Sequence, residues 1–319
     1  MARTRYAPDR GLTARMTATM FLLGLVFVAF VAAIIGIGAA YHASSAGIAL
    51  IAIVLAGGFA IGSFFYSDKI ALRTAGAVEV SPNDGDMARK LHGIVDRVCA
   101  LADMPKPRVA IARTDLPNAF ATGRNADKAV LCVTTGLMNK LDDAELEGVI
   151  AHEMSHVAHK DVQVMTIASF LAIVAALLIR IAFYGELFGG GRGRGGNNQN
   201  AAIVMLALMA VSIVVYAVSF LLIRMLSRYR ELAADRSGAF LTGQPSALKS
   251  ALVKVTGDIG KIPSRDLRTA EPLNAFFFAP AMSLRGGGPS LSSVFSTHPS
   301  LERRLAELDK VQRQLNQAG

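Results

Sequence analysis

The sequence predicts a membrane protein that is mainly α-helical, with about four transmembrane helices and one α+β domain that contains a small β-sheet. Of the 319 residues, 52% are hydrophobic and only 18% are charged, whereas about 25% of the residues of a globular domain are charged. Four apolar runs are long enough to cross a bilayer, which takes about 20 residues. This composition excludes intrinsic disorder, collagen and a small disulfide-stapled fold.

The apolar runs predict the order of the segments along the chain. Transmembrane spans are expected at Met16–Tyr41, Ser44–Ser67, Val162–Tyr184 and Ala201–Ile223. We therefore expect four segments: a tail with a first transmembrane hairpin (1–67), the first part of the polar domain (68–161), a second hairpin (162–223) and the second part of that domain (224–319). Because Gln163 and Arg180 lie in the third run, the second hairpin could instead be a hydrophobic hairpin shielded from lipid by protein.

Basic residues predict the orientation of the spans. One side collects ten Lys and Arg residues near the span ends: Arg3, Arg5, Arg10, Arg15, Lys69, Arg73, Lys160, Arg224, Arg228 and Arg230. The other side has only Arg192 and Arg194, in a glycine-rich loop. Since cytoplasmic loops carry the excess of basic residues, both termini and both polar blocks are expected in the cytoplasm. No basic stripe with interleaved aromatic residues is present, so a nucleic-acid partner is not expected.

The two polar blocks contain the pattern of one α+β domain. Apolar residues at helical spacing predict a helix over Met87–Met104, and β-branched runs predict short strands at Arg108–Ala112 and Ala129–Thr134. Asp142 with Glu145 three residues later is a capping-box pattern that opens a further helix. The tail Leu301–Gln317 is an amphipathic helix expected to pack on this domain. Cys99 and Cys132 lie in apolar stretches without metal-ligand spacing, which predicts buried free thiols.

The helix that follows Asp142 carries a metal-binding pattern, His152-Glu-Met-Ser-His156. Residues four apart lie about 40° apart around a helix, so both imidazoles point the same way and can share one metal ion. Glu153 is offset by about 100°, which lets it reach a water beside the metal without being a ligand. The spacing therefore predicts a metal site with an adjacent general base.

A catalytic zinc ion takes three protein ligands, so a third one is needed. His159 is one candidate, but it lies a further turn along the helix and would strain a straight helix. Glu231 is the other, and with Asp235 it spans one helical turn that could present a ligand together with a carboxylate supporting a ligand. A carboxylate among arginines is also often no more than a salt-bridge partner.

The HEMSH helix, the stretch Ser227-Arg-Tyr-Arg-Glu-Leu-Ala-Ala-Asp235 and four interleaved spans together resemble the HtpX membrane metalloproteases. These are bacterial relatives of the zinc-dependent CAAX prenyl proteases. The resemblance runs from the first span to about Arg304. It implies a gluzincin-like metalloprotease domain assembled from the two cytoplasmic blocks.

The resemblance also implies roles for individual residues. One Zn²⁺ ion per chain would be bound by His152, His156 and Glu231, with Glu153 as the catalytic base and Asp235 as the partner of a ligating histidine. The segment Asn118-Ala119-Phe120-Ala121 would belong to an edge strand that holds the substrate backbone by β-augmentation. His298, in a Thr-His-Pro element, could donate to the oxyanion, although a purely structural role at a helix entry is an equal alternative.

These residues predict a zinc-dependent endopeptidase that hydrolyses peptide bonds at the cytoplasmic face of a bacterial inner membrane. Membrane proteins or unfolded proteins are the expected substrates, as part of protein quality control under stress, and the lipid bilayer is the other partner. The sequence leaves cleavage-site preference and oligomeric state open.

Three other functions compete with this prediction. An intramembrane protease would place the motif within an apolar span, but charged residues surround it here. A non-catalytic scaffold with structural zinc would need four protein ligands, usually with cysteine, and neither cysteine is suitably placed. Prenyl-protein processing is the nearest enzymatic rival, and residue types alone do not exclude it.

Overall fold

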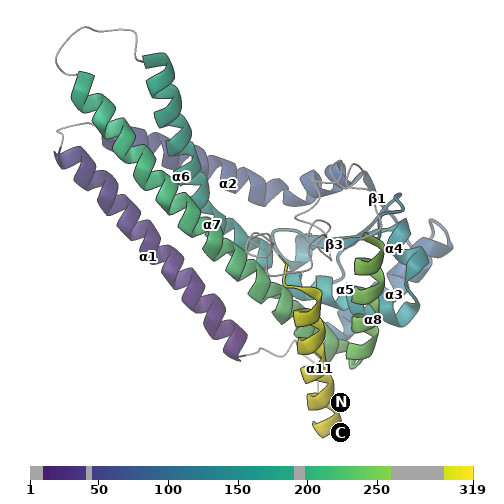
Figure 1. Ribbon diagram of the computed structural model, residues 1–319. Coiled ribbons are helices and arrows are strands. Elements are labelled where there is room, and N and C mark those ends of the chain that lie inside the picture. The colour runs from purple at the N-terminus through teal and green to yellow at the C-terminus, as the bar shows by residue number, and fades with distance from the viewer. Residues whose placement is uncertain (1–9, 41–44, 190–197, 260–297, 319) are drawn as a thin grey trace. The chain divides into compact units, whose positions relative to one another are not determined.

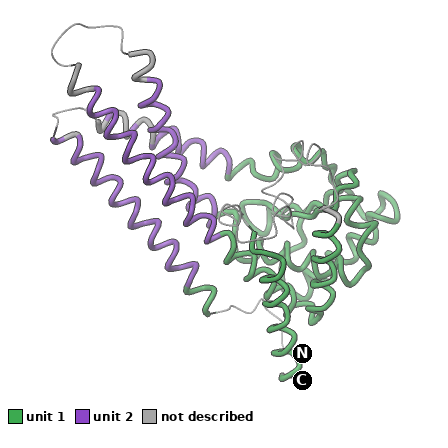
Figure 2. Tube along the Cα trace, in the orientation of Figure 1, with its two compact units in different colours: residues 1–14, 64–163, 227–319 green, residues 15–63, 164–226 purple. Residues whose placement is uncertain are grey.

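The computed structural model describes residues 10–40, 45–189, 198–259 and 298–318, and the chain divides into two compact units (Figures 1 and 2). Unit 1 consists chiefly of Phe64–Gln163 and Ser227–Gly319. Unit 2 consists of Arg15–Ser63 and Val164–Leu226. Each unit therefore combines segments that lie far apart in the sequence.

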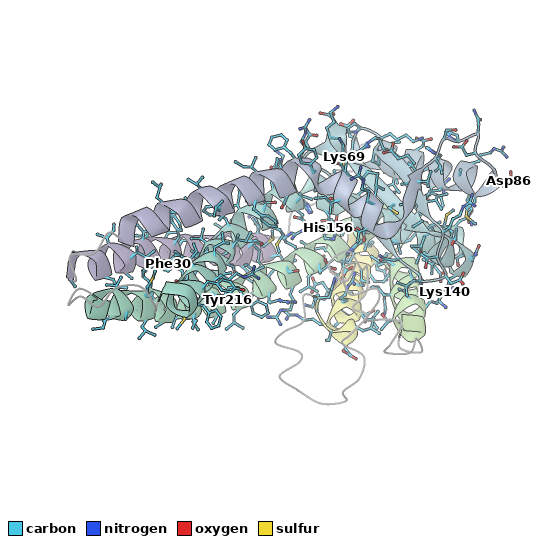
Figure 3. All side chains as sticks on the ribbon, turned by 90° about the horizontal axis from the view of Figure 1, so that it is seen from above. Phe30, Lys69, Asp86, Lys140, His156 and Tyr216 are labelled. Carbon is cyan, nitrogen blue, oxygen red and sulfur yellow. The ribbon has the colours of Figure 1, made fainter. Side chains whose placement is uncertain are left out.

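Unit 2 is built from long apolar helices. The four helices that contribute to it are α1 (Arg10–Ala40), α2 (Ser45–Ala75), α6 (Asp161–Gly189) and α7 (Asn198–Thr242). All four are long and apolar enough to cross a membrane, which confirms the predicted number of membrane helices. Phe30 lies in their shared core with Leu171, Leu178 and Leu208 (Figure 3). Only 28% of the apolar windows of α6 and α7 is buried, so a hairpin enclosed by protein is not supported.

Helix α7 is longer than the sequence suggested. It runs without interruption for 45 residues, so the apolar run and the polar turn with Glu231 and Asp235 belong to one helix. No proline occurs within it, and it ends where Gly243 adopts a φ of 67°. That left-handed conformation suits glycine and is a common helix stop.

Unit 1 contains a four-stranded sheet in the order β1-β2-β4-β3. Its strands are β1 (Ala77–Glu79), β2 (Arg108–Ala112), β3 (Ala119–Thr122) and β4 (Val130–Thr134). Strands β2 and β4 are parallel, and β1 and β3 pair antiparallel at the two sides. The predicted strands are present, and β3 is an edge strand as expected for Asn118–Gly123. Strand β1 was not predicted, because three residues are too few to show an alternating pattern.

The sheet separates two sets of buried side chains in unit 1. One face packs against α3 (Asp86–Ala102), α4 (Thr135–Lys140), α5 (Asp143–Ala158), α8 (Pro245–Ile259) and α11 (Leu301–Ala318). The other face packs against the end of α2, through Ala71, Leu72 and Ala75. Cys99 and Cys132 are buried free thiols, and burial raises the pKa of Cys132 to about 12. The mainly α fold with a small mixed sheet confirms the predicted fold class.

The start of α5 is fixed by the predicted capping box. The Asp142 carboxylate accepts a hydrogen bond from the Glu145 backbone N–H at 2.9 Å, and the Glu145 carboxylate accepts one from the Asp142 N–H at 3.0 Å. Glu145 is buried and also contacts Lys254 and Ser250 of α8, each at 2.5 Å. The box therefore sets both the first turn of α5 and its position against α8.

Replacing this cap should destabilise unit 1. Asp142→Ala removes the acceptor for the Glu145 N–H, and we expect a loss of about 1 kcal/mol in the free energy of unfolding. Denaturant unfolding of the detergent-purified chain measures it. The neighbouring Asp143→Ala is the matched control, because Asp143 makes only an exposed ion pair with Lys90, worth less than about 0.5 kcal/mol. Equal losses in the two variants would contradict the capping role.

Candidate metal centre

Three metal-ligating side chains from two helices converge in unit 1. His152 and His156 lie on α5, with their Nε2 atoms 3.3 Å apart. Glu231 of α7 places one carboxylate oxygen 3.5 Å from His156 Nε2 and the other 3.8 Å from His152 Nε2. Each of the three residues offers one donor atom within 4.8 Å of the other two. The structure thus brings together the three residues that the resemblance implies as metal ligands.

These separations suit a small tetrahedral cation. Zinc binds histidine nitrogen at about 2.0–2.1 Å, and two ligands at the tetrahedral angle then lie about 3.3 Å apart. That value matches the spacing of the two Nε2 atoms, and the Glu231 oxygen nearest His156 is only slightly further away. Two imidazoles and one carboxylate are also the donor set of a zinc site that keeps one position open.

The rings of His152 and His156 each have a carboxylate close to their Nδ1 atom. His152 Nδ1 lies 2.9 Å from Asp235, and His156 Nδ1 lies 2.5 Å from Asp161. A carboxylate on Nδ1 fixes the ring and directs the lone pair of Nε2 towards the metal position. Asp235 in turn accepts two hydrogen bonds from Arg304, at 2.6 and 2.7 Å. Both imidazoles therefore have a defined orientation.

Glu153 joins the site to the edge strand β3. It is buried on α5, and its carboxylate accepts a hydrogen bond from the Ala121 backbone N–H at 3.1 Å. Strand β3 pairs with β4 so that Thr134 N–H donates to the Asn118 carbonyl. Because bonding alternates along an antiparallel pair, Ala119 and Ala121 direct their backbone groups away from β4. The strand is tied beyond its end, where Gln163 donates to the Arg124 carbonyl.

His298 lies against Glu231, the carboxylate of the converging group. Its Nδ1 is 3.0 Å from the Glu231 carboxylate, and its side chain is buried. Arg304 approaches the same carboxylate at 3.9 Å. His298, just before α11, and Arg304, within α11, therefore both approach the carboxylate that comes from α7.

The charges around the site favour a bound cation. Burial raises the pKa of Glu153 to about 7. Burial also opposes the charged form of His156, but Asp161 and Glu231 outweigh it and raise the pKa of His156 to about 9. At His152 burial prevails over Asp235 and lowers the pKa. The negative charges of Asp161 and Glu231 thus stabilise the charged form of the His156 ring.

Comparison with known proteins identifies the family. Residues 86–312 match the model of peptidase family M48. Protease HtpX homolog 1 of Streptomyces coelicolor is 52% identical over 316 residues, covering 99% of this chain and 98% of that protein. Protease HtpX homolog 2 of Methanosarcina mazei is 49% identical over 314 residues, covering 98% and 100%. The chain belongs to peptidase family M48.

A solved structure supports the fold of this M48 chain. The crystal structure of Ste24p from S. mikatae matches with a TM-score of 0.51 at 18% identity, over 94% of this chain and 67% of that one. The predicted resemblance to HtpX proteases and their relatives is therefore confirmed. Family membership and the four apolar helices together make the chain a membrane metalloprotease.

The structure also separates the two candidates for the third ligand. Among the described residues, the converging group consists of His152, His156 and Glu231, without His159. His159 instead caps α5, with its backbone N–H donating to the Ser155 carbonyl. The helix has ended at this point, so the imidazole of His159 does not continue the ligand face.

Two residues of the site were missed in the sequence. Neither Asp161 nor Arg304 is among the site residues that the sequence or the resemblance predicts. Arg304 had a detectable signal, because it shares a helical face with Leu308 and Val311, and an arginine on an apolar face must find a buried partner. Its side chain is only 1% exposed.

Gly238 allows α7 to approach α5 at the ligands. A Cβ atom built at Gly238 would lie 2.8 Å from the His152 backbone nitrogen and 3.1 Å from its Cα. Both contacts are with backbone, which cannot move aside as a flexible side chain can. A side chain at position 238 would therefore push apart the two helices that carry the ligands.

Gly238→Ala should weaken metal binding and stability together. We expect metal affinity to fall by about tenfold or more, and the free energy of unfolding to fall by about 1–3 kcal/mol from overpacking. Gly257→Ala on α8 is the matched control, because no atom lies within 4 Å of the added Cβ. Alanine there should stabilise the helix by up to about 1 kcal/mol. Titration with Zn²⁺ measures metal affinity, and thermal unfolding measures stability. Unchanged Zn²⁺ affinity in Gly238→Ala would refute the spacing role.

Proposed function

We propose that the chain is a zinc-dependent endopeptidase that hydrolyses peptide bonds of membrane or misfolded proteins at the cytoplasmic face of a bacterial inner membrane. One observation carries this proposal. The ligand set formed by His152, His156 and Glu231 lies beside a buried glutamate, Glu153, which contacts the backbone of an edge strand. The three residues of this set, the proposed base and an edge strand thus meet within one unit.

The proposed chemistry assigns a role to each residue. Bound zinc would act as a Lewis acid that polarises the peptide carbonyl and makes a water molecule acidic. Glu153 takes a proton from the attacking water and later passes it to the leaving amine. Its raised pKa of about 7 suits a group that must both accept and release a proton near neutral pH. His298 is proposed to donate to the developing oxyanion, and its contact with Glu231 keeps it beside the ligands.

The edge strand is proposed to bind substrate through its backbone. Ala119 and Ala121 direct their N–H and C=O groups away from β4, while their side chains pack in the core. Phe120 faces the opposite side of the sheet, where it is buried. Because β3 offers few side chains to a bound strand, pairing would select an extended backbone rather than a particular sequence. This supports unfolded segments as substrates.

The catalytic role of Glu153 can be tested by one substitution. Glu153→Gln should leave zinc content unchanged, because the residue is not in the ligand set, and should lower kcat on unfolded casein by at least about 100-fold. Glu147→Gln on the same helix is the matched control, since Glu147 forms an ion pair with Arg97 away from the ligands. Zinc analysis and casein cleavage are measured on detergent-purified protein.

The result separates hydrolysis from a scaffold role. If wild type and Glu153→Gln both bind zinc, and only wild type and Glu147→Gln cleave the substrate, the result supports Glu153 as the base. If wild type and Glu153→Gln both bind zinc and neither cleaves unfolded casein or membrane-protein clients, the result would contradict the endopeptidase proposal. His152→Ala should lose both zinc and activity.

The substrate class follows from the position of the ligands along the chain. His156 lies six residues before the third apolar run, and Glu231 lies eight residues after the fourth. The excess of basic residues flanking the same ends of the spans supports a cytoplasmic location. Peptide segments that emerge from the bilayer would therefore be at a high local concentration.

Tethering should therefore accelerate cleavage. One unfolded sequence is supplied to the enzyme in liposomes, either free or fused to a transmembrane helix. The tethered form should be cleaved at least about tenfold faster, because both partners share one membrane. In detergent, where tethering is lost, the two forms should be cleaved at similar rates. Equal rates in liposomes would contradict the membrane-client proposal.

A further inference from the structure

Asp161 is a buried carboxylate that contacts both His156 and an arginine. The Asp161 oxygen that lies 2.5 Å from His156 Nδ1 also lies 2.7 Å from the Arg230 guanidinium. Asp161 is 2% exposed. A buried carboxylate shared by a histidine and an arginine has little freedom to move, so its contact with the imidazole is well defined.

A break in the helix brings Asp161 to His156. In a continuous helix, residues five apart lie about 140° apart around the axis and cannot face each other. Helix α5 ends at Ala158 and α6 begins at Asp161. Between them Lys160 adopts a φ of 57°, the left-handed conformation that non-glycine residues rarely adopt. The turn at Lys160 therefore brings Asp161 next to the imidazole of His156.

The two histidines have matching supports. His152 is backed by Asp235, which is held by Arg304 of α11. His156 is backed by Asp161, which is held by Arg230 of α7. In both sets of contacts an arginine fixes a carboxylate, and the carboxylate fixes the histidine ring through Nδ1. Helix α7 contributes to both supports, with Asp235 behind His152 and Arg230 beside Asp161.

We propose that Asp161 and Arg230 form a positioning pair that holds His156 with Nε2 directed at the metal and thereby sets the metal affinity of the site. This inference rests on the proposed metal centre and adds residues that take no part in ligation. Arg230 precedes the ligand Glu231 on α7, so the same turn of that helix supplies one ligand and supports another. Displacing the pair would misdirect His156 without removing any ligand.

The test compares metal binding with stability. Asp161→Asn keeps the shape of the side chain but removes the charge that holds Arg230 and His156. Asp161→Asn/Arg230→Gln avoids leaving a buried, unpaired arginine. The control is Asp86→Asn, because Asp86 forms a fully exposed ion pair with Arg89. For each protein, Zn²⁺ affinity is measured by chelator competition, the Co²⁺ absorption spectrum reports ligand geometry, and thermal unfolding reports stability.

The pair predicts a specific pattern. Zn²⁺ affinity should fall by about 10–100-fold in Asp161→Asn, with an altered Co²⁺ spectrum, while Asp86→Asn behaves as wild type. The double variant should lose no more affinity than Asp161→Asn, because Arg230 acts through Asp161. Wild-type Zn²⁺ affinity in both Asp161 variants, with only the unfolding temperature lowered, would overturn the inference.

The same measurements separate this inference from the proposed function. A wild-type protein that binds Zn²⁺ but cleaves no substrate would refute the endopeptidase proposal and leave the positioning pair supported by the affinity pattern. A wild-type protein that takes up no Zn²⁺ would refute both.

Discussion

The close approach of α5 and α7 is the constraint on which the rest of the site depends. One helix can aim two ligands at a metal from positions four apart, but a third at the next turn points elsewhere. The third ligand must therefore come from another helix, and its carboxylate must reach within a few ångströms of both imidazoles. Gly238 lets α7 lie against the backbone of His152, which places Glu231 and Asp235 on the correct side of α5.

That approach buries more charge than a domain of this size would normally hold. Four carboxylates lie in the network of the site, Glu153, Asp161, Glu231 and Asp235, and all are buried. Two arginines, Arg230 and Arg304, contact them. If all six groups were ionised, four negative charges would face two positive ones, so a divalent cation would neutralise the set. His156, whose pKa is raised to about 9, also contributes positive charge to this network.

A network of this kind is stable only as a whole. Removing one member of a buried ion pair leaves the other desolvated, at a cost of about 3–5 kcal/mol. Asp161, Glu231 and Asp235 each contact at least two partners, which restricts their positions. The result is a set of ligands whose orientation is fixed before the metal binds, which is what preorganisation requires.

The sequence predicted those parts of the fold that depend on local periodicity. The four apolar helices, the paired histidines on a capped helix and the strands at Arg108–Ala112 and Val130–Thr134 are all present. Each depends on residues close together in the chain, so spacing and capping chemistry were sufficient. The two predicted strands could be found from local sequence, and only their order in the sheet depends on distant segments.

The missed features depend on contacts that no local pattern encodes. Asp161 reaches His156 only because Lys160 leaves the helical conformation, and a periodicity argument assumes that the helix continues. Arg304 meets Asp235 across 69 positions of sequence, and Gly238 acquires its meaning from the backbone of α5. Strand β1 was too short to recognise. In each case the side chain or backbone acts through a partner whose position only the fold defines.

In the proposed function, the edge strand β3 connects this charged interior to the choice of substrate. The Ala121 N–H that meets Glu153 points away from β4, as would the groups that pair with a bound chain. In the proposed function, a peptide lying along β3 passes directly beside the base, so the register of pairing selects which bond is cut. In folded proteins most strands have already paired their backbone groups, and edge strands are often protected against further pairing. Selection by available backbone, rather than by side chain, would let one fixed site act on many unfolded sequences while leaving folded neighbours intact.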